Sequence, residues 1–197
     1  MAQDLISRTS FAVLFFLLLA VRNIFSIKHR KGMINIKNTQ EGKANFIIRR
    51  FILGPILGVF MIFYFINPLW MKFLLIPFPQ FVIWVGAILG LCGILFLIWV
   101  HIYLGKEWSA DLKLNTDHKL IETGPYSKIR HPMYTAVFAI YLALGIISFN
   151  YILLAVFILI IISSIIRVPD EEKMMTEKFG ERYKIYMQNT GRFLPKF

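Results

Sequence analysis

Long apolar runs with few charges dominate the hydrophobic and polar pattern of this chain. The runs extend over about Ile6–Ile27, Phe51–Ile66, Phe81–Leu104, Met133–Ser148 and Tyr151–Ile166. A helix needs about 20 such residues to cross a hydrocarbon core of about 30 Å, so the last two are short spans. The pattern predicts an all-α, polytopic membrane helix bundle of about five transmembrane helices. We expect one integral membrane domain over residues 1–197, with three spans in 1–104.

The last part of the chain carries a different pattern. Only Phe149 and Asn150 separate the last two runs, which predicts a tight helical hairpin. After it, residues Val168–Asn189 are predicted to form a cytosolic amphipathic helix, with Pro169 at its first position. Its apolar stripe consists of Met175, Phe179, Tyr183 and Met187.

Basic residues flank the apolar runs on one side. The net charge is +11, and of the 22 basic residues all except Arg8, Arg22 and Lys72 follow the first, third or fifth run. By the positive-inside rule the N-terminus lies outside and the C-terminus in the cytosol. This placement indicates membrane topology and argues against a nucleic-acid partner. The membrane would be the plasma membrane in a prokaryote and the endoplasmic reticulum in a eukaryote.

Small residues inside the runs indicate helix packing. Glycines recur four or three residues apart, a spacing that lets helices approach closely. They are Gly54 and Gly58 in the second run and Gly86, Gly90 and Gly93 in the third. Cys92 is the single cysteine, which excludes an internal disulfide and a metal cluster built on cysteines. No G-x-G-x-x-G turn indicates a Rossmann nucleotide site.

Polar residues gather in the loop 105–130 and at the junction 167–172. The predicted hairpin brings the ends of these segments together, so His131 and Tyr134 should lie near Arg167 and Glu171. Candidate chemistry therefore belongs to residues 105–197, at one face of the membrane.

Three segments here resemble the isoprenylcysteine carboxyl methyltransferase family. They are LGKEW after the third run, HKLIETGPYSKIRHPMYTA before and into the fourth, and EEKMMTEKFGERYKIYMQNTGRFLP after the fifth, within about Leu104–Pro195. The resemblance implies an integral membrane enzyme that uses S-adenosylmethionine (SAM) to methylate the carboxylate of a membrane-embedded prenylated cysteine or a similar small thioether. The active site would face the cytosol, and we expect a monomer without a metal.

The family also implies site residues. Arg167 would be catalytic and would bind the substrate carboxylate, while Glu171 would bind the amino group of SAM. The full set implied to bind the cofactor is His118, Lys119, Leu120, Ile121, Tyr126, His131, Pro132, Met133, Tyr134 and Glu171. Tyr183 and Tyr186 are expected to pack, and Glu172 and Arg130 receive no assigned role.

The sequence also fits three other hypotheses about function. A phospholipid or amine N-methyltransferase would use the same cofactor, but Arg167 is poorly suited to a cationic headgroup. An NADPH-dependent membrane reductase would share the topology. A scaffold or transporter is a fourth class, although transporters usually place ionisable residues near the middle of the bilayer.

Overall fold

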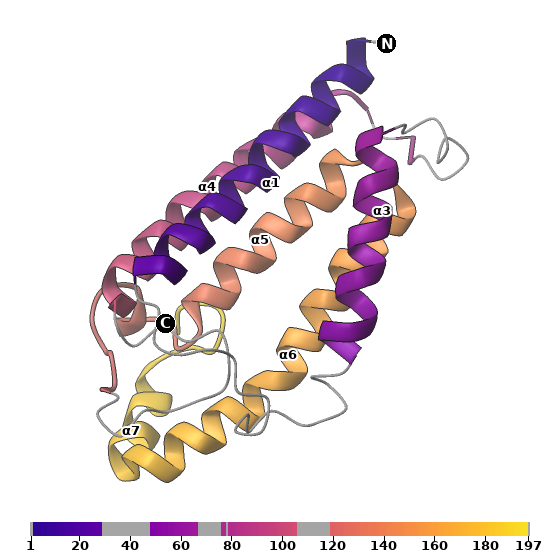
Figure 1. Ribbon diagram of the computed structural model, residues 1–197. Helices are drawn as coiled ribbons and strands as arrows, with labels where there is room; N and C mark the ends of the chain where they lie inside the picture. Colours follow the sequence, from indigo (N-terminus) through magenta and orange to yellow (C-terminus); the bar gives the residue numbers. More distant parts are fainter. Residues whose placement is uncertain (1, 29–47, 67–75, 78, 106–118, 197) are drawn as a thin grey trace.

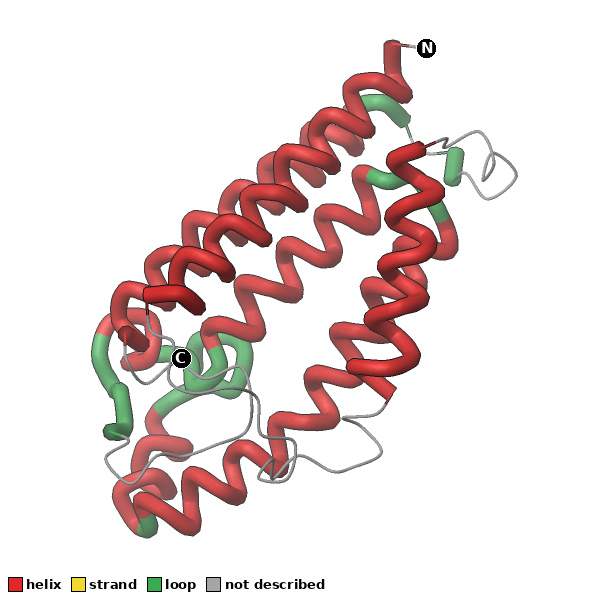
Figure 2. Tube along the Cα trace, viewed as in Figure 1, coloured by secondary structure: helices red, strands yellow, loops and turns green. Residues whose placement is uncertain are grey.

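The computed structural model describes residues 2–28, 48–66, 76–77, 79–105 and 119–196, which are nearly all helical (Figure 2). Its elements are α1 (Ala2–Lys28), the π-helix η2 (Ile48–Leu53), α3 (Gly54–Ile66), α4 (Phe81–Leu104), the 3₁₀-helix η5 (Gly124–Ser127), α5 (Pro132–Ile147), α6 (Tyr151–Phe179) and α7 (Glu181–Asn189). Within these ranges the only β-pairing is an isolated parallel bridge between Ile129 and Gly191. The predicted all-α class is confirmed.

Helix α5 forms the centre of the bundle. Figure 1 shows it between the pair α1 and α4 on one side and the pair α3 and α6 on the other. Ala136, Ile140, Ala143 and Leu144 are fully buried along it, as expected for a helix enclosed by others. The first residues of α5, which belong to the candidate site, are therefore held by a packed core.

Glycines allow α4 to lie against α5. A Cβ added at Gly93 would stand 2.7 Å from a side-chain carbon of Ile140, and one at Gly86 would stand 2.7 Å from Ile147. The predicted packing role of these glycines is confirmed. The prediction for Gly58 is wrong, because nothing lies within 4 Å of a Cβ there: that side of α3 faces outward.

The outer faces of the bundle are apolar and exposed. Phe16, Ile62, Trp84 and Ile88 are among the large apolar residues that remain more than half exposed. Soluble monomers rarely expose so much contiguous apolar surface. Among the described residues, three helices are long and apolar enough to cross a membrane: Leu5–Ile27, Phe81–Leu104 and Tyr151–Phe179. The chain is an integral membrane protein; the shorter α3 and α5 leave five spans as a prediction.

A tight turn joins α5 and α6, as the two-residue separation predicted. Asn150 is the N-cap of α6, and its side-chain oxygen accepts from the backbone N–H groups of Ile152 at 3.0 Å and Leu153 at 3.1 Å. Such a cap satisfies donors that the first helical turn otherwise leaves unpaired. The hairpin thus fixes the two helices that carry the candidate residues.

The predicted separate helix Val168–Asn189 is wrong in its boundaries. Pro169 lies inside α6, which continues to Phe179, and Figure 1 shows α6 turning away from α5 toward α7 in its second half. A proline can bend a helix whose flanking turns remain intact. The break comes at Gly180, where φ is +58°, a left-handed conformation that glycine adopts without steric cost.

Candidate functional site

The loop that enters α5 begins at a glycine and ends at a proline. Gly124 has φ +60°, and a Cβ there would stand 2.5 Å from the ring of Tyr103, so the loop fits closely against the end of α4. His131 is the N-cap of α5, and Pro132 follows at a first helical position, where its missing N–H costs nothing. The loop thus delivers His131 to the start of the central helix.

Residues from α5 and α6 meet at this end of the bundle. The Tyr134 hydroxyl donates a 2.9 Å hydrogen bond to Oε2 of Glu171, and Nδ1 of His131 lies 3.9 Å from Oε1 of the same carboxylate. Glu171 is half-buried, and Oε1 keeps acceptor capacity for a further donor. The part of the expected juxtaposition that concerns Glu171 is present.

Arg167 lies one helical turn before Glu171. It is 6% exposed, and its buried Nε has no hydrogen-bond partner. No ion pair or hydrogen bond joins Arg167 to any residue that the structure describes, Glu171 included. A buried guanidinium without a counter-charge costs several kcal/mol, roughly, in desolvation, so the position favours an anion. Its spacing from Glu171 places both groups on one face of α6.

Glu172 is the centre of a network of basic side chains. Its Oε1 accepts from Nε of Arg130 at 3.1 Å, Nε2 of His131 at 3.3 Å and Nε of Arg192 at 3.2 Å. A second Arg192 nitrogen donates to Oε2. The apolar stretch of α6 ends at Ile166, so this network lies beyond the predicted membrane span. It joins the loop before α5, helix α6 and the end of the chain.

The network changes the acidity of Glu172. Burial alone would raise the pKa of the carboxyl group, but hydrogen bonds from His131, Arg192 and Arg130 outweigh burial and lower that pKa from 4.5 to about 2. Glu172 is therefore ionised at neutral pH and fully engaged by its donors. These contacts give Glu172 a structural role, which is to hold the side chain of His131. The sequence alone assigned Glu172 no role.

The end of the chain lies along the loop before α5. We call residues Thr190–Phe193 the C-terminal strap. The N–H of Arg130 donates to the carbonyl of Gly191 at 2.8 Å, and the N–H of His131 donates to that of Arg192 at 3.0 Å. The Thr135 hydroxyl donates to the carbonyl of Phe193 at 2.7 Å. The strap thus covers one side of His131.

Tyr126 lies deeper in the loop. Burial, and then the nearby Glu171 carboxylate, raise the pKa of its hydroxyl above the ordinary value, so it stays neutral. Its carbonyl accepts a 2.6 Å hydrogen bond from the hydroxyl of Tyr186. Tyr183 and Tyr186 pack with Leu120 in a small core, which confirms their predicted packing role. The predicted stripe residues Met175, Phe179 and Met187 pack against that core.

The other predicted cofactor residues are distributed around this cluster. Pro132 is buried, Ile121 and Met133 are half-buried, and Lys119 is exposed. Leu120 is engaged in the small core. His118 lies outside the described residues.

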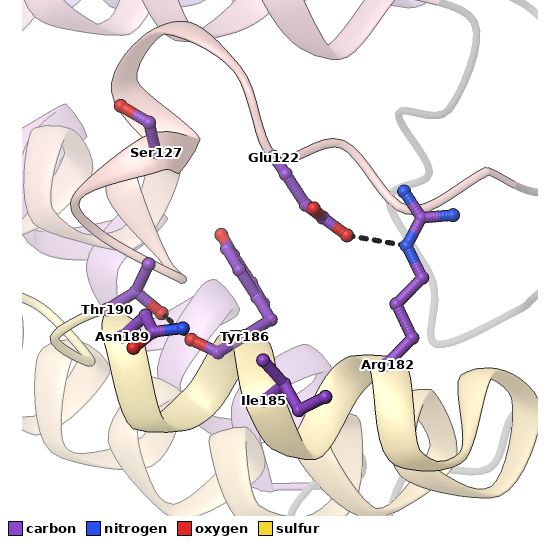
Figure 3. Close-up of a pocket in the computed structure, with 7 residues that line it drawn as sticks. All are labelled: Glu122, Ser127, Arg182, Ile185, Tyr186, Asn189 and Thr190. Atoms are coloured by element: carbon purple, nitrogen blue, oxygen red, sulfur yellow. Dashed lines mark hydrogen bonds and ion pairs between the residues drawn. The ribbon is translucent and has the colours of Figure 1, made fainter.

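A hollow of about 450 Å³ lies beside this cluster, between η5 and α7 (Figure 3). It is lined by Glu122, Ser127, Arg182, Ile185, Tyr186, Asn189 and Thr190. Glu122 and Arg182 form an exposed ion pair at 2.8 Å across its edge. Ser127 and Tyr186 donate to backbone carbonyls, so their hydroxyls are already engaged. None of the predicted cofactor residues lines this hollow.

Sequence reasoning missed the strap and Arg192. Neither has a periodic pattern, because the strap pairs with a loop about 60 positions earlier in the chain and Arg192 pairs with Glu172, 20 positions earlier. The sequence signal that points to Arg192 is its place in GRFLP, at the end of the third segment of resemblance. The sequence assigns Arg130 no role, and the structure pairs it with Glu172 and with the carbonyl of Met187 at 2.9 Å.

Helices with apolar outer faces and one end rich in ionisable groups define an integral membrane protein with a candidate site at that end. Residues 84–177 match the model of the Isoprenylcysteine carboxyl methyltransferase (ICMT) family, so the resemblance predicted from the motifs is confirmed over this part of the chain. The match supports a membrane methyltransferase. Comparison with curated proteins found no match.

The fold has a solved counterpart. The structure of the eukaryotic intramembrane Ras methyltransferase ICMT (isoprenylcysteine carboxyl methyltransferase), determined without a monobody, is similar with a TM-score of 0.61. The two sequences are 20% identical, and the alignment covers 96% of this chain and 67% of that chain. At 20% identity, this similarity is evidence for the fold alone.

Proposed function

We propose that the chain is a SAM-dependent carboxyl O-methyltransferase whose acceptor is a membrane-embedded prenylated cysteine or a similar small thioether. The observation that carries the proposal is Arg167, a buried guanidinium with no partner among the described residues. The family match gives the reaction class, and the name of the similar solved protein gives the acceptor class.

Arg167 suits an acceptor carboxylate. Charge-assisted pairs between a guanidinium and a carboxylate are strong and hold the anion in a fixed plane. A carboxylate with an ordinary pKa of about 4 is ionised at neutral pH, so the acceptor needs no general base. The work of the site is then to position the acceptor oxygen in line with the methyl group and to exclude water.

The residues near Arg167 fit SAM. Glu171 would hold the amino group through the free capacity of Oε1, with Tyr134 fixing the other oxygen. His131 would hydrogen-bond the cofactor, and the rings of Tyr126 and Tyr134 offer faces that attract a cation. When bound, SAM supplies an electrophilic methyl group on a sulfonium. Lys119, Ile121 and Met133 complete the proposed cofactor segment, along with Leu120, Pro132 and His118.

The proposed orientation follows the charge distribution. The end of the bundle with α7 carries the described basic residues of the loop before α5 and of α7, so we place it in the cytosol. SAM would enter from the aqueous side and the lipid chain from the bilayer. An amine-headed lipid is a poorer acceptor, because its positive charge would face Arg167.

A methyl-transfer assay with matched acceptors tests this function. Purified protein is incubated with labelled SAM and either a prenylcysteine analogue with a free carboxylate or its methyl ester. We expect label in the first product and none with the ester. An amine-headed lipid is added as a competing acceptor. If the label appeared in that lipid and not in the prenylcysteine analogue, the proposed acceptor class would be contradicted. Absence of SAM binding would contradict the whole proposal.

A further inference from the structure

His131 is held mainly by two features that touch no proposed ligand. Its Nε2 donates to Glu172, and its backbone N–H donates to the strap carbonyl of Arg192. The rings of Phe193 and Tyr134 lie beside the imidazole, with ring centroids 6.1 Å and 5.7 Å away and the ring planes tilted. The orientation of the imidazole therefore depends on Glu172 and on the C-terminal strap.

Arg192 is the side chain of the strap that fastens it to α6. Both of its ion-pair contacts go to Glu172, which is 8% exposed, while Arg192 itself is 46% exposed. If Arg192 lost its charge, Arg130 and His131 would still satisfy the buried carboxylate. A substitution there should loosen the strap without leaving a buried charge uncompensated.

We propose that Glu172 and Arg192 are positioning residues for the proposed reaction: their ion pair holds the strap against the loop and so keeps His131 turned toward the cofactor beside Glu171. This inference rests on the proposed function. It assigns to the last residues of the chain a part in cofactor binding, although they approach it only through His131.

The test compares Arg192→Gln with Lys184→Gln, which removes the same charge from an exposed ion pair with Glu181 on α7. Two quantities are measured in detergent: hydrogen exchange of the Arg130 and His131 amides without cofactor, and the SAM dissociation constant by calorimetry. Loss of a hydrogen bond to a charged group typically corresponds to about tenfold or more in an equilibrium. We expect about tenfold faster exchange and about tenfold weaker SAM binding in Arg192→Gln only.

Arg192→Lys keeps the charge and should recover part of both effects. Thr135→Val loosens the strap at its other end without changing charge, so it tests the inference if Arg192→Gln does not fold. Faster exchange with unchanged SAM affinity would make the strap merely structural and would overturn the inference. Unchanged exchange would overturn it as well.

The two arms separate this inference from the proposed function. If the wild-type protein binds no SAM, the proposed function fails and the cofactor part of the inference fails with it. The exchange arm still decides whether Arg192 orders His131, because it needs no ligand. If SAM binds and Arg192→Gln changes neither quantity, only the inference fails.

Discussion

At the residue scale, single ionisable groups do different work although they are neighbours. On α6, Arg167 is buried without a described partner, Glu171 is half-buried with one acceptor oxygen in reserve, and Glu172 is surrounded by donors. The three occupy little more than one helical turn. Their different surroundings, rather than their residue types, suggest substrate, cofactor and positioning roles.

The two ligand roles predict separable defects. Arg167→Gln should reduce methyl transfer by at least about 100-fold, the typical loss for a charged partner of a reacting group, with the SAM dissociation constant nearly unchanged. Glu171→Gln should instead weaken SAM binding by about tenfold. Kinetics with varied acceptor and calorimetry with SAM distinguish the two. Equal effects of both variants on SAM affinity would contradict the assignment.

Glu172 predicts a response to acid. Its pKa is lowered from 4.5 to about 2 by its donors, so the stability that its carboxylate contributes is complete above pH 4.5 and is lost as the pH falls toward 2. Protection of the Arg130 amide, which is the intrinsic exchange rate at each pH divided by the observed rate, should fall with acid over this window. Glu172→Gln should show less protection at neutral pH and a smaller change of protection with pH. A variant with the wild-type pH profile would show that Glu172 is not the titrating group.

The pattern of hydrophobic and polar positions predicts that such residues meet only when they lie on helices whose connection is also predicted. His131, Tyr134 and Glu171 were predicted to meet because only two residues separate the fourth and fifth apolar runs, which predicts the hairpin that carries them. Arg192 was not, because the strap pairs with a loop by bonds that no local periodicity encodes. The predicted ligand roles stay predictions until a ligand is measured.

At the element scale, the same spacing of glycines has two outcomes. Gly86 and Gly93 face α5, whereas Gly58 faces outward, and the sequence contains no signal that separates them. Pro169 was expected to begin a helix, yet α6 continues through it and ends at Gly180 instead. Hydrophobic pattern predicts that a helix exists, while its end depends on backbone conformation and tertiary packing.

Glycine variants test the packing of α4 on α5. Gly93→Ala places a Cβ 3.2 Å from the carbonyl oxygen of Ala136, which cannot move freely, and 2.7 Å from Ile140. We expect a loss of about 1–3 kcal/mol in the free energy of unfolding, as for overpacked cores. Gly58→Ala, the matched control, should be neutral or stabilising by up to about 1 kcal/mol. Thermal unfolding in detergent measures both, and equal midpoints would contradict the interface.

At the scale of the whole molecule, the bundle has two unlike ends. Figure 1 shows the N-terminus at one end and α7 at the other, with the start of α5 near α7. The all-α membrane class and the hairpin were predictable from hydropathy alone. The number of helices that cross the bilayer was not predictable from hydropathy, because α3 and α5 are short and neighbouring helices bury part of their surface.

Labelling tests the orientation. In a Cys92→Ala background, single cysteines are introduced as Gln3→Cys and Lys184→Cys. By the positive-inside rule an impermeant maleimide should label position 3 in intact cells and position 184 only after permeabilisation. The reverse pattern would place the candidate site on the outer face, away from cytosolic SAM.

The central claim is that the cluster around His131 and Glu171 binds SAM. Calorimetric titration of the purified protein with SAM, repeated with His131→Ala, tests it most directly. We predict saturable one-site binding to the wild-type protein and at least about tenfold weaker binding to the variant, since a buried ligand contact is lost. Absence of binding to the wild-type protein, or equal affinity in the variant, would contradict the claim.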